Sequence, residues 1–181
     1  MKDPERQFTA LEPLADETDE NIERVIAINL LGCARTMHAV LPMMIAKKKG
    51  AIINIGSVAG EAAVMGVYSG SKFGLRGLND SVRREVRMHG IGVTLIEPGF
   101  VRSPMNAAMG DGLPSPDIVA NAIVRAVDRP RRRVIVPKRY HVPVFFVKMF
   151  PGLVDLVFGD ARIQNRLNRD AREARSAEGR V

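Results

Sequence analysis

The sequence predicts an α/β fold in which helices flank a parallel sheet, and three observations support this prediction. The chain has 181 residues, of which 46% are hydrophobic, so it is long and apolar enough for one domain with a core. Long segments with helical apolar spacing alternate along it with short apolar runs. The short runs end in Gly, Ser or Pro, which stop strands. Such alternation is typical of strand–helix–strand units, whose strands run parallel.

The first expected helix covers residues 18–49. Thr18 can cap its start, and the two acidic residues after it suit the positive end of the helix dipole. Apolar side chains recur along it at helical spacing, at Ile22, Val25, Ile26, Leu30, Cys33, Met37, Val40, Leu41 and Met44. Three consecutive lysines complement the other end of the dipole, and we expect Gly50 to end the helix.

Two strands and a second helix are expected next. The run "AIINIGS" (51–57) is short and apolar and ends in Gly and Ser, which predicts a buried strand. A helix is then expected over residues 66–89 and should end at Gly90. The run "GVTLIEPG" (92–99) predicts the second strand, which Pro98 stops.

The last third begins with a helix start at Ser115-Pro116-Asp117, with Pro in the first turn. One apolar face is expected on this helix, formed by Ile118, Val119, Ala122, Ile123, Ala126 and Val127. The run "RVIVP" predicts the third strand. After it, "YHVPVFFVKMFPGLVDLVFG" is apolar but should be interrupted by Pro143 and Pro151. We therefore divide the chain into a domain of residues 1–139 and a tail of residues 140–181, apolar and then charged, which we expect to be helical.

Composition excludes several classes of protein. The single cysteine, Cys33, rules out an internal disulfide framework and suits a reducing, cytoplasmic compartment. The three histidines are scattered, so no metal site is expected. The first residues form neither a signal nor a transit peptide. The sequence contains no run of 18 apolar residues, so we expect no membrane span. The net charge of +7 is attributed to solvated segments, and with two Tyr and no Trp we expect no nucleic-acid partner.

Polar side chains gather where the predicted strands end. Ser57 ends the first strand and Pro98-Gly99 ends the second, and the carboxyl ends of parallel strands share one edge of a sheet. Tyr68 and Lys72 open the next helix, four residues apart and therefore on one face. A nearby ammonium favours the phenolate and lowers the pKa of a tyrosine, so the pair is a candidate general acid and base.

Each of these residues also has a structural interpretation. Asn29 falls on the apolar face of the first helix, where it could anchor a water behind Lys72 or simply join two helices. Ser57 could hold a substrate oxygen beside the phenol or be a turn residue. A Tyr and a Lys four residues apart also occur by chance. The combination, in this order and on this topology, favours a catalytic site.

The motifs "NLLG", "AIINIGSVAG", "YSGSK" and "IEPGFVRSPM" together resemble the short-chain dehydrogenase/reductase family over most of residues 11–137. The resemblance implies a partial Rossmann-like, doubly wound parallel sheet. It also implies a catalytic tetrad of Asn29, Ser57, Tyr68 and Lys72. Tyr68 would exchange a proton with a carbonyl or alcohol, Ser57 would orient that oxygen, and Lys72 would bind the nicotinamide ribose and lower the phenol pKa.

The same resemblance implies NAD or NADP as the cofactor, held by Tyr68 and Lys72 and by a loop whose residues Pro98, Gly99, Val101 and Ser103 line the nicotinamide. Ser103 stands where the family often has Thr. The segment between Ser57 and Tyr68 is slightly shorter than the family usually has. The family's amino-terminal strand, glycine-rich turn and helix, which bind the pyrophosphate, have no counterpart in this sequence, and residues 1–17 resemble only a later part of the family's sequence.

Two functions therefore stay open. One is an oxidoreductase that acts on a small, hydrophobic carbonyl or alcohol; the other is an inactive family member that serves as an interaction module. The resemblance also implies a homo-oligomer in which the helices over residues 18–49 and 66–89 meet a second subunit. The small residues Gly70, Gly74 and Gly77 would permit that close approach. For residues 140–160 we favour a cover over the substrate pocket above contact with a membrane surface.

Overall fold

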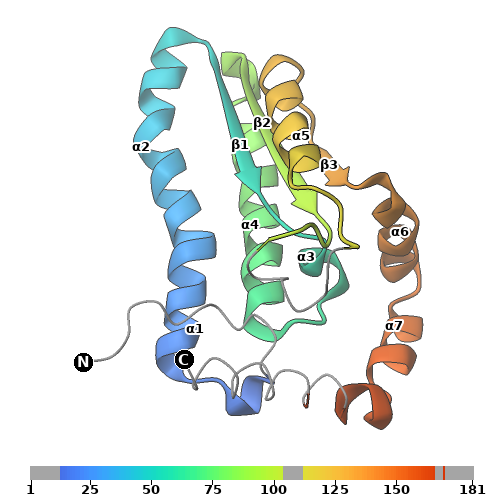
Figure 1. The fold of residues 1–181 in the computed structure, drawn as a ribbon. Helices are drawn as coiled ribbons and strands as arrows, with labels where there is room; N and C mark the ends of the chain where they lie inside the picture. Colours follow the sequence, from blue (N-terminus) through green and yellow to red (C-terminus); the bar gives the residue numbers. More distant parts are fainter. Residues whose placement is uncertain (1–12, 104–111, 166–168, 170–181) are drawn as a thin grey trace.

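A three-stranded parallel sheet forms the centre of the protein (Figure 1). The structure is a computed structural model that describes residues 13–103, 112–165 and 169. The strands β1 (Gly50–Ile55), β2 (Ile91–Pro98) and β3 (Arg133–Val136) lie in the order β1-β2-β3. Ile52 pairs with Val93, and Ile96 pairs with Val134. The α/β class, the three strands and their parallel direction are confirmed.

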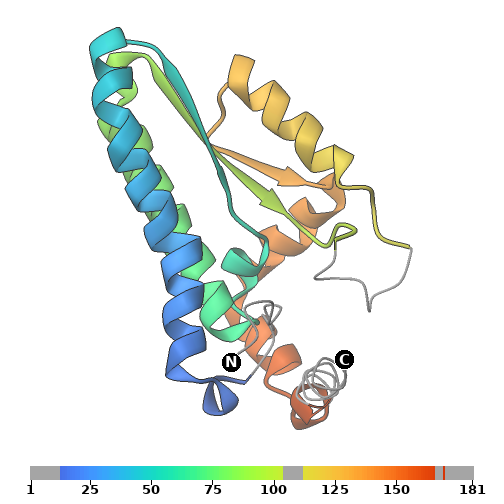
Figure 2. The same cartoon turned by 60° about the vertical axis from the view of Figure 1, so that its left-hand side comes forward.

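Helices cover both faces of this sheet, as Figure 2 shows. One face packs against α2 (Gly32–Lys47) and α4 (Gly66–Glu85), and the other packs against α5 (Asp117–Asp128). The first core contains Met37, Ile52, Val82, Val86, Ile91 and Val93, and the second contains Ile96, Ala122 and Ala126. Neighbouring strand residues point to opposite faces, which is why β2 supplies both cores. The chain is therefore doubly wound, as expected.

The first helical segment is built from three pieces rather than from one uniform helix. A short 3₁₀ turn, η1 (Leu14–Asp16), precedes α1 (Asp19–Ile26), a π-helical segment η2 (Ala27–Leu31) and α2. Thr18 caps α1 as predicted, because its hydroxyl accepts a hydrogen bond from the Asn21 amide at 3.2 Å.

The predicted end of this helix at Gly50 is wrong. Lys48 takes the left-handed conformation, with φ of 48°, and ends the helix two residues earlier. Gly50 already belongs to β1, where an added Cβ would come within 2.6 Å of the Met44 sulfur. This glycine therefore marks close packing of the strand on α2 rather than a helix cap, since a side chain there would have to displace the Met44 side chain.

The helix over residues 66–89 continues from α4 into the 3₁₀ turn η3 (Arg87–His89) and ends at Gly90, which has the expected left-handed φ of 70°. The sequence did not predict α3 (Ala59–Ala62), a single turn between β1 and α4. On α5, Ala122 and Ala126 are buried as expected, but Val127 is 51% exposed and does not belong to the apolar face.

The apolar tail is helical, as expected. After η5 (Lys138–Tyr140) it forms α6 (His141–Met149) and α7 (Pro151–Phe158), bent by 102° with respect to each other. Pro151 separates the two helices, but the predicted break at Pro143 is wrong. Pro143 lies in the first turn of α6, where its missing N–H has no intrahelical partner to lose. Residues 161–165 are also helical, and most of the remaining charged segment lies outside the described residues.

Among the described residues, the continuous helix Asp19–Lys47 is long and apolar enough to cross a membrane, and the bent pair of α6 and α7 passes the same test when taken together. Our expectation that no segment would qualify considered only uninterrupted apolar runs. A helix of a soluble protein also passes this test by length and composition, so the finding does not place the chain in a membrane.

Candidate functional site at the carboxyl edge of the sheet

The ends of β1 and β2 meet at one edge of the sheet, as the sequence predicted. The Gly56 amide donates to the Ile96 carbonyl at 2.7 Å, and the Val58 amide donates to the Pro98 carbonyl at 3.0 Å. These two bonds place Ser57 beside the Pro98-Gly99 turn. The Ser57 hydroxyl accepts a hydrogen bond from the Ala59 amide at 3.1 Å, which orients it at the start of α3.

Tyr68 and Lys72 lie on the first turns of α4 and face this edge. The Lys72 Nζ is 5.5 Å from the centroid of the Tyr68 ring and donates to the Ile55 carbonyl, at the end of β1, at 3.1 Å. The short α3 packs tightly on the same turn, because a Cβ on Gly60 would approach the Lys72 carbonyl carbon to 2.9 Å. Gly60 therefore lets the segment after Ser57 lie directly against the Tyr–Lys helix.

Burial controls the charges of this pair. It raises the pKa of Tyr68, and the neighbouring Ser57 hydroxyl offsets only part of that effect. Burial also lowers the pKa of Lys72. Our expectation that the ammonium would lower the pKa of the phenol is therefore wrong for this chain, because burial raises that pKa and the Ser57 hydroxyl, rather than Lys72, is the group that partly offsets it. The protonated phenol is the favoured form at neutral pH.

Asn29 lies in the π-helical segment η2, half-buried behind the Tyr–Lys helix. Its side-chain amide donates to the Ser71 hydroxyl at 3.2 Å, and Ser71 donates to the Tyr68 carbonyl at 2.7 Å. Asn29 is therefore linked to the Tyr68 backbone through Ser71, which is the helix-joining contact that its place on the apolar face also allowed. A water bound between Asn29 and Lys72 stays a prediction.

The loop after β2 is held by an aromatic ring from the tail. Gly99 lies under Tyr140, and an added Cβ there would collide with the ring. The Phe100 amide donates to the Tyr140 hydroxyl at 3.2 Å. Val101 and Ser103 continue this loop and are half-buried. No pattern in the sequence pointed to Tyr140, and the segment after Ser103 that we expected on the substrate side lies partly outside the described residues.

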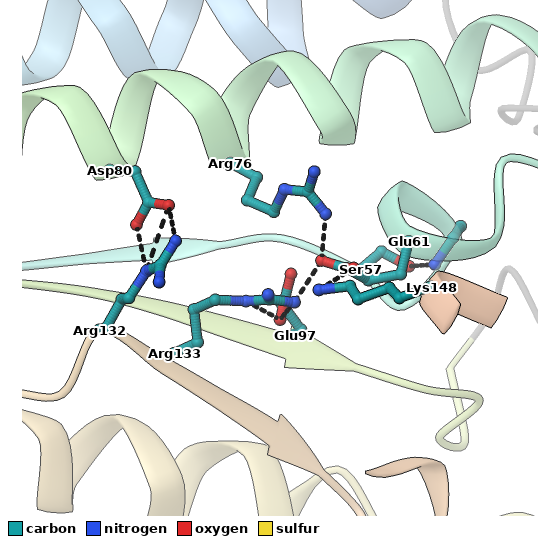
Figure 3. A network of polar contacts seen from close by, with 9 residues as sticks. Ser57, Glu61, Arg76, Asp80, Glu97, Arg132, Arg133 and Lys148 are labelled. Atoms are coloured by element: carbon teal, nitrogen blue, oxygen red, sulfur yellow. Dashed lines mark hydrogen bonds and ion pairs between the residues drawn. The ribbon is translucent and has the colours of Figure 1, made fainter. Parts of the chain in front are cut away.

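A buried cluster of charges lies next to Ser57 (Figure 3). The Glu61 carboxylate, on α3, pairs with Arg76 of α4 at 2.7 Å, with Lys148 of α6 at 2.5 Å, and with Arg133 of β3. Arg133 also donates from Nε to Glu97 of β2 at 2.8 Å. The Glu61 side chain is fully buried, and it joins α3 to three other elements. We call these five residues the Glu61 cluster.

The two carboxylates of the Glu61 cluster differ in their pKa. Burial opposes ionisation of Glu61, but hydrogen bonds from Lys148 and Arg76 and the charge of Arg133 outweigh it and lower the pKa. Glu97 has only Arg133 as a basic partner, and burial together with the neighbouring Glu61 carboxylate raises its pKa to about 7. One signal in the sequence could have indicated the cluster, namely a glutamate inside the otherwise apolar run "GVTLIEPG". A separate pair, Asp80 with Arg132 at 2.6 Å, lies further along α4.

The glycines of α4 are used differently from one another. An added Cβ on Gly74 would contact Leu30 of the same chain at 3.1 Å, whereas Gly70 and Gly77 face open space. Exposed apolar side chains lie near these helices, among them Ile28, Leu31 and Phe73. Within the described part of the chain, no group of three or more His, Cys, Asp or Glu could hold a metal ion.

Comparison with known proteins identifies the family of this chain. Residues 8–113, more than half of the chain, match the family model described as short chain dehydrogenase. Retinol dehydrogenase 5 of Homo sapiens is 43% identical over 89 residues, which are 49% of this chain and 28% of that protein. An uncharacterized oxidoreductase of Myxococcus xanthus is 32% identical over 140 residues, 74% of this chain and 54% of that protein.

Solved structures of short-chain dehydrogenases have a similar fold. A short-chain dehydrogenase from Sphingobium yanoikuyae in complex with NADPH superposes with a TM-score of 0.67 at 26% identity, covering 84% of this chain and 62% of that one. The chain spans about half, or less, of the length of the curated relatives that it matches.

Proposed function

The chain belongs to the short-chain dehydrogenase family, and on this premise we propose that it carries the proton-transfer site of an NAD- or NADP-dependent oxidoreductase. The proposed substrate is a small carbonyl or alcohol compound. The observation that supports this best is the convergence of Tyr68, Lys72 and Ser57 at the carboxyl edge of the sheet, beside the turn that ends β2. Ligands of open α/β sheets bind at this edge.

The residues at this edge fit a nicotinamide nucleotide. Lys72 has three N–H donors, of which one goes to the Ile55 carbonyl, and an ammonium of this kind suits the hydroxyls of a ribose. The loop from Pro98 to Ser103 would border the nicotinamide ring. A bound nicotinamide supplies or accepts the hydride in such enzymes, and this chain's own residues handle the proton.

Tyr68 is the proposed proton donor. Its raised pKa keeps the phenol protonated at neutral pH, which is the form that can protonate the oxygen of a carbonyl substrate as it is reduced. Ser57 would hold that oxygen by a hydrogen bond, since its hydroxyl lies beside the phenol and lowers its pKa. Asn29 is proposed to act through the helix backbone at Tyr68 rather than on the substrate.

The substrate is proposed to be apolar. The relative retinol dehydrogenase 5 is named for an apolar alcohol. The loop after β2 on this side of the chain also carries apolar residues. Neither observation distinguishes NAD from NADP, so both cofactors belong in the assay.

The test compares Tyr68→Phe with the unaltered protein, each joined to an amino-terminal strand–helix segment with a glycine-rich turn taken from a relative. Removing only the hydroxyl should lower carbonyl reduction by at least about 100-fold, because the proton donor is lost, while NADPH or NADH binding is retained. Ser57→Ala should also lower the rate, whereas Ser81→Ala, on the exposed side of α4, is the matched control. Near-normal turnover by Tyr68→Phe would refute the assignment.

A further inference from the structure

Helices α6 and α7 present apolar side chains to solvent at helical spacing. On α6, Val142, Phe145, Phe146 and Met149 are between 49% and 63% exposed and have the i, i+3, i+4, i+7 pattern of a single face. On α7, Leu153, Leu156 and Val157 repeat this spacing and are between 44% and 73% exposed. We call these residues the outer face.

The opposite face of α6 is docked on the protein, so the orientation of the helix is fixed. Val144 is buried, and Lys148, one turn later, reaches the buried Glu61 carboxylate of α3 at 2.5 Å. A turn of the helix that placed the outer face inward would break this ion pair and expose Val144. The apolar exposure is therefore a property of the docked helix.

The outer face continues from one helix toward the next. The rings of Phe146 and Phe150 stack with centroids 6.0 Å apart, and Phe145 meets Phe146 edge to face at 5.8 Å. Phe150 lies at the corner between the helices and is 52% exposed. Contiguous exposed apolar surface of this kind marks an interaction site.

Charge complementarity selects the occupant. Of the four basic side chains between Lys138 and Arg162, Lys148 is paired with Glu61 and the other three lie at the two ends of the segment, which also contains two acidic side chains. The whole chain carries a net charge of +7. Apolar residues on one face with basic residues at the flanks are the features by which helices bind the surface of an anionic bilayer.

We infer that the outer face of α6 and α7 binds the surface of an anionic lipid bilayer, in place of the cover over the substrate pocket that we favoured from the sequence, because this face points to solvent. The helices lie in the interface and do not span it, because nine and eight residues reach only about 14 and 12 Å. A hydrocarbon core is about 30 Å thick. The 102° bend between the helices prevents them from forming one continuous span.

The experiment measures co-sedimentation of the 181-residue protein with vesicles of phosphatidylcholine alone and of phosphatidylcholine with phosphatidylserine. The unaltered protein should bind the anionic vesicles at least tenfold more tightly than the neutral ones, and less tightly as salt increases. The double variant Phe145→Glu/Leu156→Glu should lose at least tenfold in affinity. The matched control is Val124→Glu/Val127→Glu, which adds the same charges at exposed apolar positions of α5 and should lose much less.

Three outcomes would overturn the inference. The first is equal binding by the outer-face variant and the α5 variant. The second is binding that does not depend on phosphatidylserine. The third is a lower oligomeric mass of the outer-face variant in the absence of vesicles, which would assign the face to a second copy of the chain. Circular dichroism of both variants checks that α6 and α7 remain folded.

Discussion

Glu61 and Glu97 share one arginine, and their unequal supply of partners decides which of them holds a proton. Glu61 has Arg76, Arg133 and Lys148, whereas Glu97 has Arg133 alone. Both side chains are out of contact with water, and a buried carboxylate is costly unless it is paired. Glu97 is therefore the carboxylate that takes up a proton first, as pH falls through about 7, whereas Glu61 remains charged and holds α3 in place next to Ser57.

A pH dependence of stability is expected from Glu97. Its pKa is raised from an ordinary 4.5 to about 7, so the folded chain binds more protons than the unfolded chain between these values. Stability should therefore fall as pH rises from about 4.5 to about 7, by up to about 3 kcal/mol. The pKa values of Glu61 and Asp80 are lowered in the folded chain. The stability that these two carboxylates contribute is therefore lost only as pH falls below this window.

Urea unfolding between about pH 5 and pH 7.5 measures this effect. Glu97→Gln should unfold with a flatter pH profile than the unaltered chain. The three histidines are common to both proteins, so the difference between the profiles isolates Glu97. Glu85→Gln, which removes an exposed carboxylate from the end of α4, is the matched control. Parallel profiles of Glu97→Gln and the unaltered chain would contradict the prediction.

At the scale of elements, the surface of α1, η2, α2 and α4 is proposed to form a subunit interface. Only 11% of the apolar window in Asp19–Lys47 is buried within the chain. Ile28, Leu31, Met43 and Phe73 are each more than 40% exposed on these helices. Gly70 and Gly77 face open space and allow a second backbone to approach, whereas Gly74 is occupied by Leu30 of the same chain.

Phe73→Glu should therefore weaken self-association, because it places a charge in an apolar interface. We expect the unaltered protein to sediment as a dimer or tetramer and this variant to dissociate at a concentration at least about tenfold higher. Val124→Glu on α5 is the control for an added surface charge. A bulky residue at Gly74 is a poorer test, because it would disturb packing against Leu30 within one chain. A strictly monomeric unaltered protein would refute the proposed interface.

At the scale of the whole molecule, the described sheet has three strands, and within it β1 pairs only with β2. The other edge of β1 offers backbone groups that no described strand pairs, beside the 40% exposed Ile55. Such an edge accepts another strand or promotes aggregation. The sequence also holds no glycine-rich turn of the kind that binds a pyrophosphate at a helix N-terminus.

The 181-residue chain alone should therefore bind NADH and NADPH weakly, with a Kd well above the low micromolar range. Fluorescence titration of the purified chain measures this, and the extended protein used to test Tyr68→Phe provides the positive control. Saturable binding in the low micromolar range by the chain alone would show that it holds the nucleotide by other groups. Poor solubility that improves in the extended protein would agree with an unpaired β1 edge.

Much of the fold could be predicted from periodicity and from residues with strong backbone preferences. The apolar runs located all three strands, and Gly90, Thr18 and Pro116 marked helix ends where the structure has them. Lys48 could not be foreseen, because a left-handed lysine has no local signature and its conformation depends on how β1 must pack on α2. The break at Pro143 was wrongly predicted because the start of α6, which makes this proline harmless, is fixed by contacts with α3.

The sequence by itself determined the α/β class, the parallel strands and the placement of Ser57, Tyr68 and Lys72 at one edge, because helical spacing is local and a helix between two consecutive strands returns the chain in the same direction. Only the tertiary structure decided the pKa of Tyr68 and the ion pairs of the Glu61 cluster. Burial raises the pKa of Tyr68, where adjacency to Lys72 predicted the opposite. The tertiary structure also brings Glu61, Glu97 and Arg133 together from three separate elements. Solvation and long-range ion pairs depend on which segments meet in space, and one-dimensional order does not contain that information.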